Sequence, residues 1–351
     1  MMGKLKKLTG YRLFLPLSCL IIVLLINLIT TPTFFRITIN NGVLYGYIID
    51  VINRASELVV LAVGMTLVVS ASAGTDISVG AVMAVAAAVC TRVLAGGEVS
   101  VNEYANPYVL AVLAALAAAV VCGGFNGSLV AKLKIQPMVA TLILFTAGRG
   151  ISQLVTNGQI TYIRVDGYKL LGNNIPGIPI PTPIFVAVIV VVLTYILLKK
   201  TAMGMYIQSV GINERASRLV GLKSVKIIWM AYAFCGLCAG IAGLVASSRI
   251  YSADANNIGL NMELDAIAAV ALGGNSLGGG RFSLLGSVIG AYTIQALTTT
   301  LYAMSVPADQ IPVYKAIVVI LIVAVQSEEL KKFRKRLASR HSSKNVEGGV
   351  A

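Results

Sequence analysis

Several ionisable side chains lie in or beside long apolar runs of this chain: Asp76, Arg149, Asp265, Arg281 and Lys315. A charged group in such surroundings costs several kcal/mol unless it is paired or faces water. We therefore expect these side chains to pair or to line a polar cavity. Two interpretations remain open: the groups hold helices together, or they line a path for a polar solute.

Two local patterns add uncharged polar groups to this set. Asp76 stands beside Gly74, Ser78 and Gly80, so its carboxylate is expected to cap a broken helix end or to accept from nearby amides. The run GGNSLGGGR, Gly273 to Arg281, lacks the G-K-[ST] ending of a phosphate-binding loop and predicts a sharp backbone turn. The predicted translocation path or buried polar network comprises Asp76, Ser78, Arg149, Asp265, Asn275 and Arg281.

Residues for catalysis and metal binding are sparse. The single histidine, His341, lies in a polar tail, which argues against histidine-based catalysis and histidine metal sites. Cys235 and Cys238 form a C-x-x-C without a second pair, so packing explains them better than zinc. We expect no catalytic residue, no metal site and no cofactor bound by this chain.

Composition indicates a polytopic membrane protein. Of the 351 residues, 57% are hydrophobic and only 12% are charged, about half the charged fraction of soluble domains. The run from 13 to 31 is too long for a signal peptide and is interpreted as a first span. Further apolar runs lie near 57–73, 77–95, 107–131, 137–155, 183–198, 227–248, 263–272, 283–303 and 311–326. The prediction is an all-α protein with about ten transmembrane segments, in which 43–55 is either an interfacial helix or part of its neighbour.

Positive charge predicts the orientation. Basic residues gather in 1–12, at Lys132 and Lys134, in the loop 199–226 and in the tail 327–351. An even number of spans places these groups on one side, which the positive-inside rule makes the cytoplasm. The predicted organisation is a cytoplasmic N-terminus 1–12, a membrane domain 13–326 and a cytoplasmic tail 327–351. The net charge of +14 is then explained by topology and anionic lipid, without nucleic acid.

The loop 199–226 contains a short polar stretch, GINERASRLVG, from Gly211 to Gly221. Asn213 is a suitable N-cap, Glu214 suits the positive end of a helix dipole, and Gly221 suits the C-terminal stop. Ala216, Leu219 and Val220 share one side of the predicted helix, beside the charges of Arg215 and Arg218. The segment is either a connector to a soluble partner or an ordinary loop helix at the membrane surface.

Longer motifs resemble one transporter family. The segment with E-x-A at Glu214 to Ala216 resembles the coupling loop of permeases from bacterial ATP-binding-cassette (ABC) importers. Three further segments resemble signatures of the simple-sugar permeases in that class, and the galactofuranose-type permeases are the most similar. The segments are ELDAIAAVALGGNSLGGGRFSLLGSVIGA (263–291), GTDISVGAVMAV (74–85) and ILFTAGRGISQLVTNG (143–158). The resemblance covers roughly residues 55 to 326.

The resemblance implies a type II importer architecture, like that of the cobalamin permease, in the bacterial inner (plasma) membrane. It implies a homo- or heterodimer of permeases, two cytosolic ATPase domains that bind ATP, and a periplasmic or lipid-anchored binding protein that delivers the sugar. Coupling to the ATPase would use Asn213, Glu214, Arg215, Ala216, Arg218, Leu219 and Gly221.

The predicted external face carries three candidates for docking the binding protein: Arg164, Lys169 and Arg249. Binding proteins of such importers commonly present carboxylates, and these would form ion pairs with the three cations. A different class of function remains an alternative: an ion-coupled secondary transporter of a small polar solute, with Asp76 or Asp265 as a ligand near the membrane midplane.

Overall fold

The computed structural model describes residues 13–40 and 42–326, and the chain is mainly helical. The basic segments 1–12 and 327–351, both predicted to be cytoplasmic, lie outside the described residues. The α-helices are α2 (Phe14–Thr30), α3 (Tyr47–Ser72), α4 (Val79–Ala95), α5 (Tyr108–Ala131), α6 (Pro137–Val155), α7 (Thr182–Lys200), α8 (Met203–Ile212), α9 (Glu214–Leu219), α10 (Ser224–Ile250), α11 (Met262–Leu272), α12 (Leu284–Ala303) and α13 (Ile311–Gln326). Two short 3-10 helices, η1 (Pro32–Phe35) and η2 (Tyr168–Leu170), complete the helical elements of this part of the chain.

Six helices of the described residues are long and apolar enough to cross a membrane: α3, α5, α6, α7, α10 and α12. Helices α2, α4 and α13 contain shorter apolar stretches, and α11 has 11 residues. The prediction of a polytopic helical membrane protein is confirmed at this level. The segment 43–55 is no separate helix, because a short strand ends at Tyr45 and α3 begins at Tyr47.

The core forms where small residues let helices approach closely. Helices α3 and α10 are the most buried of the long helices, and α10 packs on α3, α4 and α5. A Cβ at Gly64 of α3 would lie 3.0 Å from atoms of both Cys235 and Cys238 on α10. Gly123 of α5 and Gly236 of α10 face each other in the same way. The C-x-x-C therefore packs against a glycine, which agrees with its predicted packing role, and Gly236 of α10 permits close contact with α5.

Short strands form one hairpin and one small sheet. β1 (Thr38–Asn40) and β2 (Val43–Tyr45) form a hairpin before α3. β3 (Ser100–Val101), β4 (Thr161–Ile163) and β5 (Ser252–Ala253) form one sheet, in which β4 pairs in parallel with β3 and antiparallel with β5. Three loops far apart in sequence therefore meet at one end of the helices.

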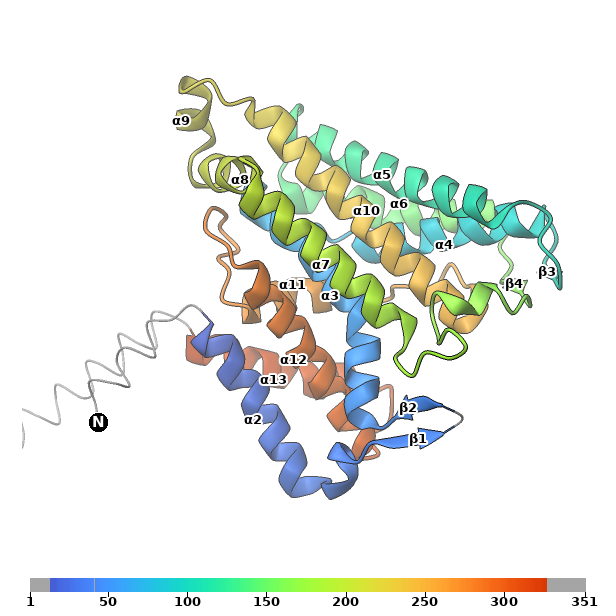
Figure 1. The fold of residues 1–351 in the computed structure, drawn as a ribbon. Coiled ribbons are helices and arrows are strands. Elements are labelled where there is room, and N and C mark those ends of the chain that lie inside the picture. The colour runs from blue at the N-terminus through green and yellow to red at the C-terminus, as the bar shows by residue number, and fades with distance from the viewer. Residues whose placement is uncertain (1–12, 41, 327–351) are drawn as a thin grey trace, which may run out of the picture.

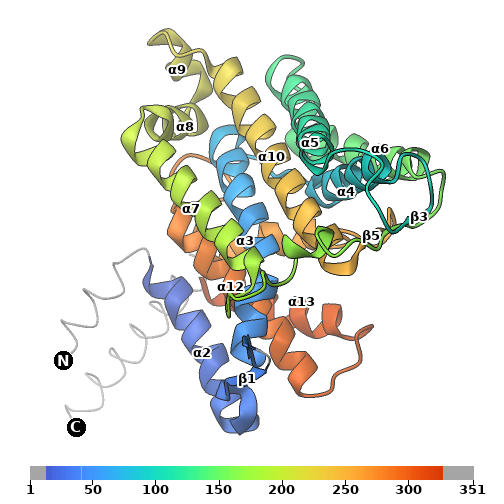
Figure 2. The same cartoon turned by 45° about the vertical axis from the view of Figure 1, so that its right-hand side comes forward.

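The two ends of the molecule carry different elements (Figures 1 and 2). Helices α8 and α9 lie together at the end where α7 finishes and α10 begins. The sheet β3-β4-β5 lies toward the opposite end of α10, because β5 follows its last residue directly. Helix α2 is attached to α12 by a buried hydrogen bond of 2.7 Å from Asn27 Nδ2 to Thr300 Oγ1.

Candidate functional site

Helix α9 has the caps that its sequence predicts. The Asn213 side chain accepts a hydrogen bond of 2.9 Å from the backbone N–H of Ala216. Gly221, just beyond the last turn, has φ +84°, a conformation that glycine adopts without strain. Glu214 accepts from Lys134 and Arg218, which lie on different elements. Helix α9 is therefore held at both ends and fastened to the turn between α5 and α6.

The outward side of α9 is apolar and uncovered. Leu219 is 89% exposed and Val220 is 77% exposed, and Ala216 and Arg215 are exposed beside them. Ser217 is the buried residue of this helix and faces the rest of the chain. A short helix that turns large apolar side chains into the surroundings has a surface suited to a partner.

Directly beneath α9, three backbones meet without space for a side chain. A Cβ at Gly211, at the end of α8, would collide with the carbonyl oxygen of Ser70 at the end of α3. The N–H of Gly280 donates to that same carbonyl at 3.0 Å. The glycine-rich run 273–281 is thus a sharp turn, as predicted, and it joins α8 to α3.

Asp76 closes the turn between α3 and α4. Its Oδ1 accepts from the backbone N–H of Ser78 at 2.9 Å and from the Ser78 hydroxyl at 2.6 Å. Asn126 of α5 donates to the same hydroxyl at 2.8 Å, and all three residues are buried. The expectation that Asp76 accepts from nearby amides is confirmed. A role in the translocation path stays a prediction for Asp76 and Ser78.

Asn275 forms a second buried network at the start of α12. Its amide donates to the Val270 carbonyl at 3.1 Å and to the Ser287 hydroxyl at 2.7 Å. Thr66 of α3 donates to the same Ser287 hydroxyl at 2.6 Å. Asn275 therefore ties α11 and α12 to the centre of α3.

The opposite end holds a polar cavity of about 530 Å³ between α3, α10, α11 and α12. Two ion pairs border it. Asp265 pairs with Lys315 of α13 at 2.7 Å, and Glu57 pairs with Arg249 at 3.2 Å, with all four side chains less than one-quarter exposed. The remaining polar lining includes Arg54, Asp254, Asn257, Gln295, Thr298 and Tyr302.

Arg149 fixes the loop that covers this end. Its guanidinium donates to the backbone carbonyls of Ala255 at 2.9 Å and Ile258 at 2.5 Å. Its Nη2 and the Oε2 of Glu263 are buried without a hydrogen-bond partner among the described residues. Arg149 and Asp265 are thus brought to the same end of the molecule, whereas Asp76 and Asn275 lie in two separate networks.

The chain is similar to the permease components of known transport systems. Residues 47–326 match the family described as "Branched-chain amino acid transport system / permease component". The chain belongs to this permease family. The galactofuranose transporter permease protein YtfT of Escherichia coli (strain K12) is 44% identical over 324 residues, 92% of each chain.

Two other relatives of the permease also carry the names of sugars. The fructose import permease protein FruF of Bifidobacterium longum (strain NCC 2705) is 37% identical and is aligned over 99% of this chain and 96% of its own. The ribose import permease protein RbsC of E. coli (strain K12) is 35% identical over 89% of this chain and 93% of its own. No solved structure matches the permease significantly.

The structure corrects one expectation for the permease. Arg281 is exposed at the end of the glycine-rich run, so it does not belong to a buried polar network. The physical reason is its place at the surface, just before the N-terminal turn of α12, where its guanidinium has no ion-pair partner among the described residues. Among the described residues, no three His, Cys, Asp or Glu side chains are arranged to hold a metal ion.

The three docking candidates on the permease differ in accessibility. Arg164 is exposed, with its guanidinium 5.9 Å from the centre of the Tyr162 ring. Lys169 forms an exposed pair of 2.7 Å with Asp166. Arg249 is only 18% exposed, because it pairs with Glu57 and donates to the Asn53 carbonyl. Arg164 presents its charge outward, whereas Arg249 is engaged inside the fold.

Several residues of these sites were missed from the sequence. Asn126 and Thr66 each complete a buried network, and both lie in long helices that are mainly apolar. An isolated polar side chain in a spanning helix is itself a signal, because it requires a partner. Glu57, which begins the apolar run 57–73, likewise has a partner in Arg249.

Proposed function

We propose that this chain is the membrane subunit of an ABC importer that translocates a simple sugar. The single observation that carries the proposal is α9, a capped helix whose apolar side is exposed at the end where basic residues gather. The printed names of three relatives, which include galactofuranose, fructose and ribose, support the substrate class. Selectivity among sugars would reside largely in a separate binding protein.

The proposed arrangement has ten membrane segments: α2, α3, α4, α5, α6, α7, α10, α11, α12 and α13. This count places α9 and both termini in the cytoplasm and β3, β4 and β5 outside, in a type II importer architecture. The pattern of basic residues supports this orientation. Introduced cysteines at Arg215 and Gln159, both exposed, should label from opposite sides of sealed vesicles once Cys19 and Cys122 are replaced by serine.

The proposed assembly contains two permeases, identical or paralogous, with two ATPase domains below and a binding protein above. ATP on the ATPase domains would favour their closed dimer and thereby shift the permease between its two accessible states. Asn213 to Gly221 would transmit this shift through the glycine junction at Gly211. The cavity beside Asp265 would receive the sugar, since polar side chains from four helices converge there.

Docking of the binding protein would use Arg164 above all. Charge reversal at Arg164 should slow docking most at low salt, because exposed charge pairs act over about 10 Å at 0.1 M salt. Reversal at Lys169 should have a smaller effect, since Asp166 already neutralises it locally. Reversal at Arg249 would instead break the pair with Glu57, so its effect on docking would be mixed with one on folding.

The test of the proposal is Ala216→Glu. A larger, negative side chain on the exposed face of α9 should prevent copurification of the ATPase and stimulation of its hydrolysis, while membrane insertion stays normal. Ala202→Glu is the matched control, because Ala202 is also exposed at this end but precedes α8. Normal assembly and transport by Ala216→Glu would reject the proposal. Uptake by this chain alone, driven by an ion gradient, would favour a secondary transporter.

A further inference from the structure

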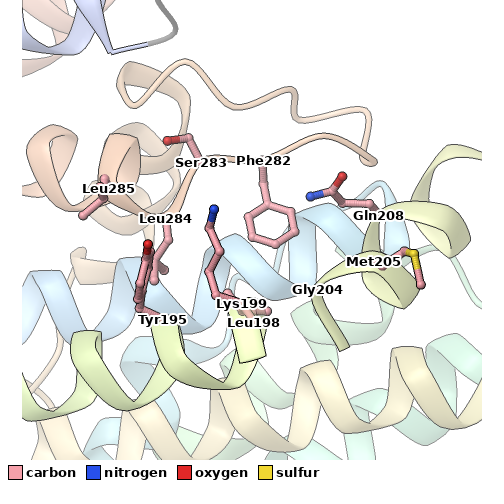
Figure 3. A pocket seen from close by; sticks show the side chains of 10 residues that line it. All are labelled: Tyr195, Leu198, Lys199, Gly204, Met205, Gln208, Phe282, Ser283, Leu284 and Leu285. Atoms are coloured by element: carbon pink, nitrogen blue, oxygen red, sulfur yellow. The ribbon is translucent and has the colours of Figure 1, made fainter. Parts of the chain in front are cut away.

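A second cavity, of about 450 Å³, lies between the end of α7, helix α8 and the segment that leads into α12 (Figure 3). Its lining combines aromatic, aliphatic and polar side chains, including Tyr195, Lys199, Gln208, Phe282, Ser283 and Leu285. It is separate from the polar cavity at Asp265, since it lies at the end of the molecule that carries α8 and α9. The translocation and coupling sites do not use it.

The charge in this cavity is positive, and the described residues that line it do not compensate it. Figure 3 shows Lys199 extending from α7 into the space beside Phe282. Its Nζ lies 6.0 Å from the centre of the Tyr195 ring, and no ion pair of Lys199 occurs among the described residues. The lining contains no Asp or Glu, and the exposed Arg281 directly precedes Phe282. The site therefore favours an anion.

An apolar track leads to the same lysine. Val188, Val192, Tyr195 and Lys199 follow one another at intervals of four, three and four residues, which places them along one face of α7. Val188, Val192 and Tyr195 are each 44% to 52% exposed. Helix α7 is also the least buried of the long apolar helices. This face would contact acyl chains, and it ends at a cation at the membrane surface.

We propose that the cavity binds the phosphate headgroup of an anionic phospholipid from the cytoplasmic leaflet, with an acyl chain along Val188 and Val192. The orientation rests on the proposed function, which places the end of α7 at the cytoplasm. Lys199 contacts the phosphate, and Arg281 adds charge at the rim. A free phosphate ion would satisfy the same cation but would leave the aromatic and aliphatic walls uncovered. The ligand class is therefore an anionic amphiphile.

Lipid titration of the purified permease, with bound lipids counted by native mass spectrometry, tests the site. Phosphatidylglycerol should bind, whereas phosphatidylcholine and inorganic phosphate should bind weakly. Lys199→Gln should weaken phosphatidylglycerol binding about fivefold, the equivalent of about 1 kcal/mol for one cation near anionic lipid. Lys200→Gln removes the same charge from the same helical turn, but Lys200 does not line the cavity, so its effect should stay below about twofold.

Three outcomes would overturn the assignment. Equal weakening by Lys199→Gln and Lys200→Gln would indicate diffuse surface charge. Inorganic phosphate that competes as well as phosphatidylglycerol would indicate a site for free anions. Loss of the ATPase in Lys199→Gln with unchanged lipid binding would indicate a protein contact. The titration needs neither ATPase nor sugar, so its failure would leave the result of Ala216→Glu standing.

Discussion

The two ends of this permease treat charged and apolar side chains in opposite ways. At the end with the polar cavity, Asp265 and Lys315 form a pair that is mostly buried. At the end with α9, Glu214 pairs with cations that are about half exposed, and Leu219 points outward. The first end thus pairs these charges in mostly buried positions, whereas the second leaves an apolar side chain uncovered beside half-exposed charges.

This difference separates charges that are paired inside the chain from a surface that is open to the proposed ATPase. Removing one partner of a buried pair leaves an uncompensated charge, so the fold itself is destabilised. Exposed pairs contribute about 0 to 1 kcal/mol, so changes on α9 have little effect on folding. Mutations at the two ends should therefore separate stability from assembly.

The largest expected effect is on stability at the polar cavity. Asp265→Asn should lower the free energy of unfolding by about 3 kcal/mol, because Lys315 would remain charged without its partner in a largely buried position. Thermal unfolding in detergent would measure the loss. Arg218→Met, which breaks an exposed pair on α9, should change stability by less than about 1 kcal/mol.

The double variant Asp265→Asn with Lys315→Met is the control for that prediction. It removes both charges and should recover most of the lost stability, because no unpaired charge remains. If the double variant were as unstable as Asp265→Asn, the carboxylate would act through contacts other than the ion pair. The contrast between the two ends would then lose its electrostatic basis.

A smaller effect is expected at the cap of α9. Asn213→Ala removes the bond to the Ala216 N–H and should cost about 1 kcal/mol of helix stability, which reduces ATPase affinity about fivefold if α9 must be helical in the complex. Asn213→Ser keeps a capping oxygen and should retain near-normal affinity. Pull-down titrations of the ATPase would compare the two. Equal affinity of all three proteins would show that the cap plays no part in assembly.

The smallest effect concerns the charge at the first turn of α9. Burial alone would raise the pKa of Glu214, but hydrogen bonds and charge from Lys134 and Arg218 hold it below its usual value of 4.5. The contribution of the ionised carboxylate is therefore complete above that value and is lost as pH falls through the lowered pKa. ATPase binding should show no titration of Glu214 from about pH 8 to about pH 5. Glu214→Gln should weaken binding by about 0.3 to 1 kcal/mol, and a Glu214-dependent transition above pH 5 would contradict the assignment.

Local features were predictable from the sequence. Asn213 caps a helix that starts at the next residue, and Asp76 accepts from a residue two positions away, so neither depends on the rest of the fold. The glycine-rich turn after α11 was also recognisable from its composition, and Gly274, Gly279 and Gly280 there adopt positive φ. The apolar runs predicted the long helices because the bilayer sets their length.

Contacts between distant segments were not predictable in the same way. The sequence marked Asp265 and Lys315 as charges that need partners, but 50 residues separate them, and their pairing depends on how α11 and α13 pack. Arg249 was interpreted as a docking residue because it is a cation on the predicted external face, whereas packing of α10 on α3 places it beside Glu57. Arg281 was expected to be buried because apolar runs flank it, yet its turn projects to the surface.

The junction beneath α9 has a consequence for protein engineering. A Cβ at Gly211 would meet the Ser70 carbonyl, and Gly280 bonds to that carbonyl from another segment. A chimera that receives only the short segment 213–221 from another permease would keep this fit intact. A graft that begins before Gly211 must bring compatible residues at positions 70 and 280 as well. The boundary of an exchangeable module therefore lies between Gly211 and Asn213.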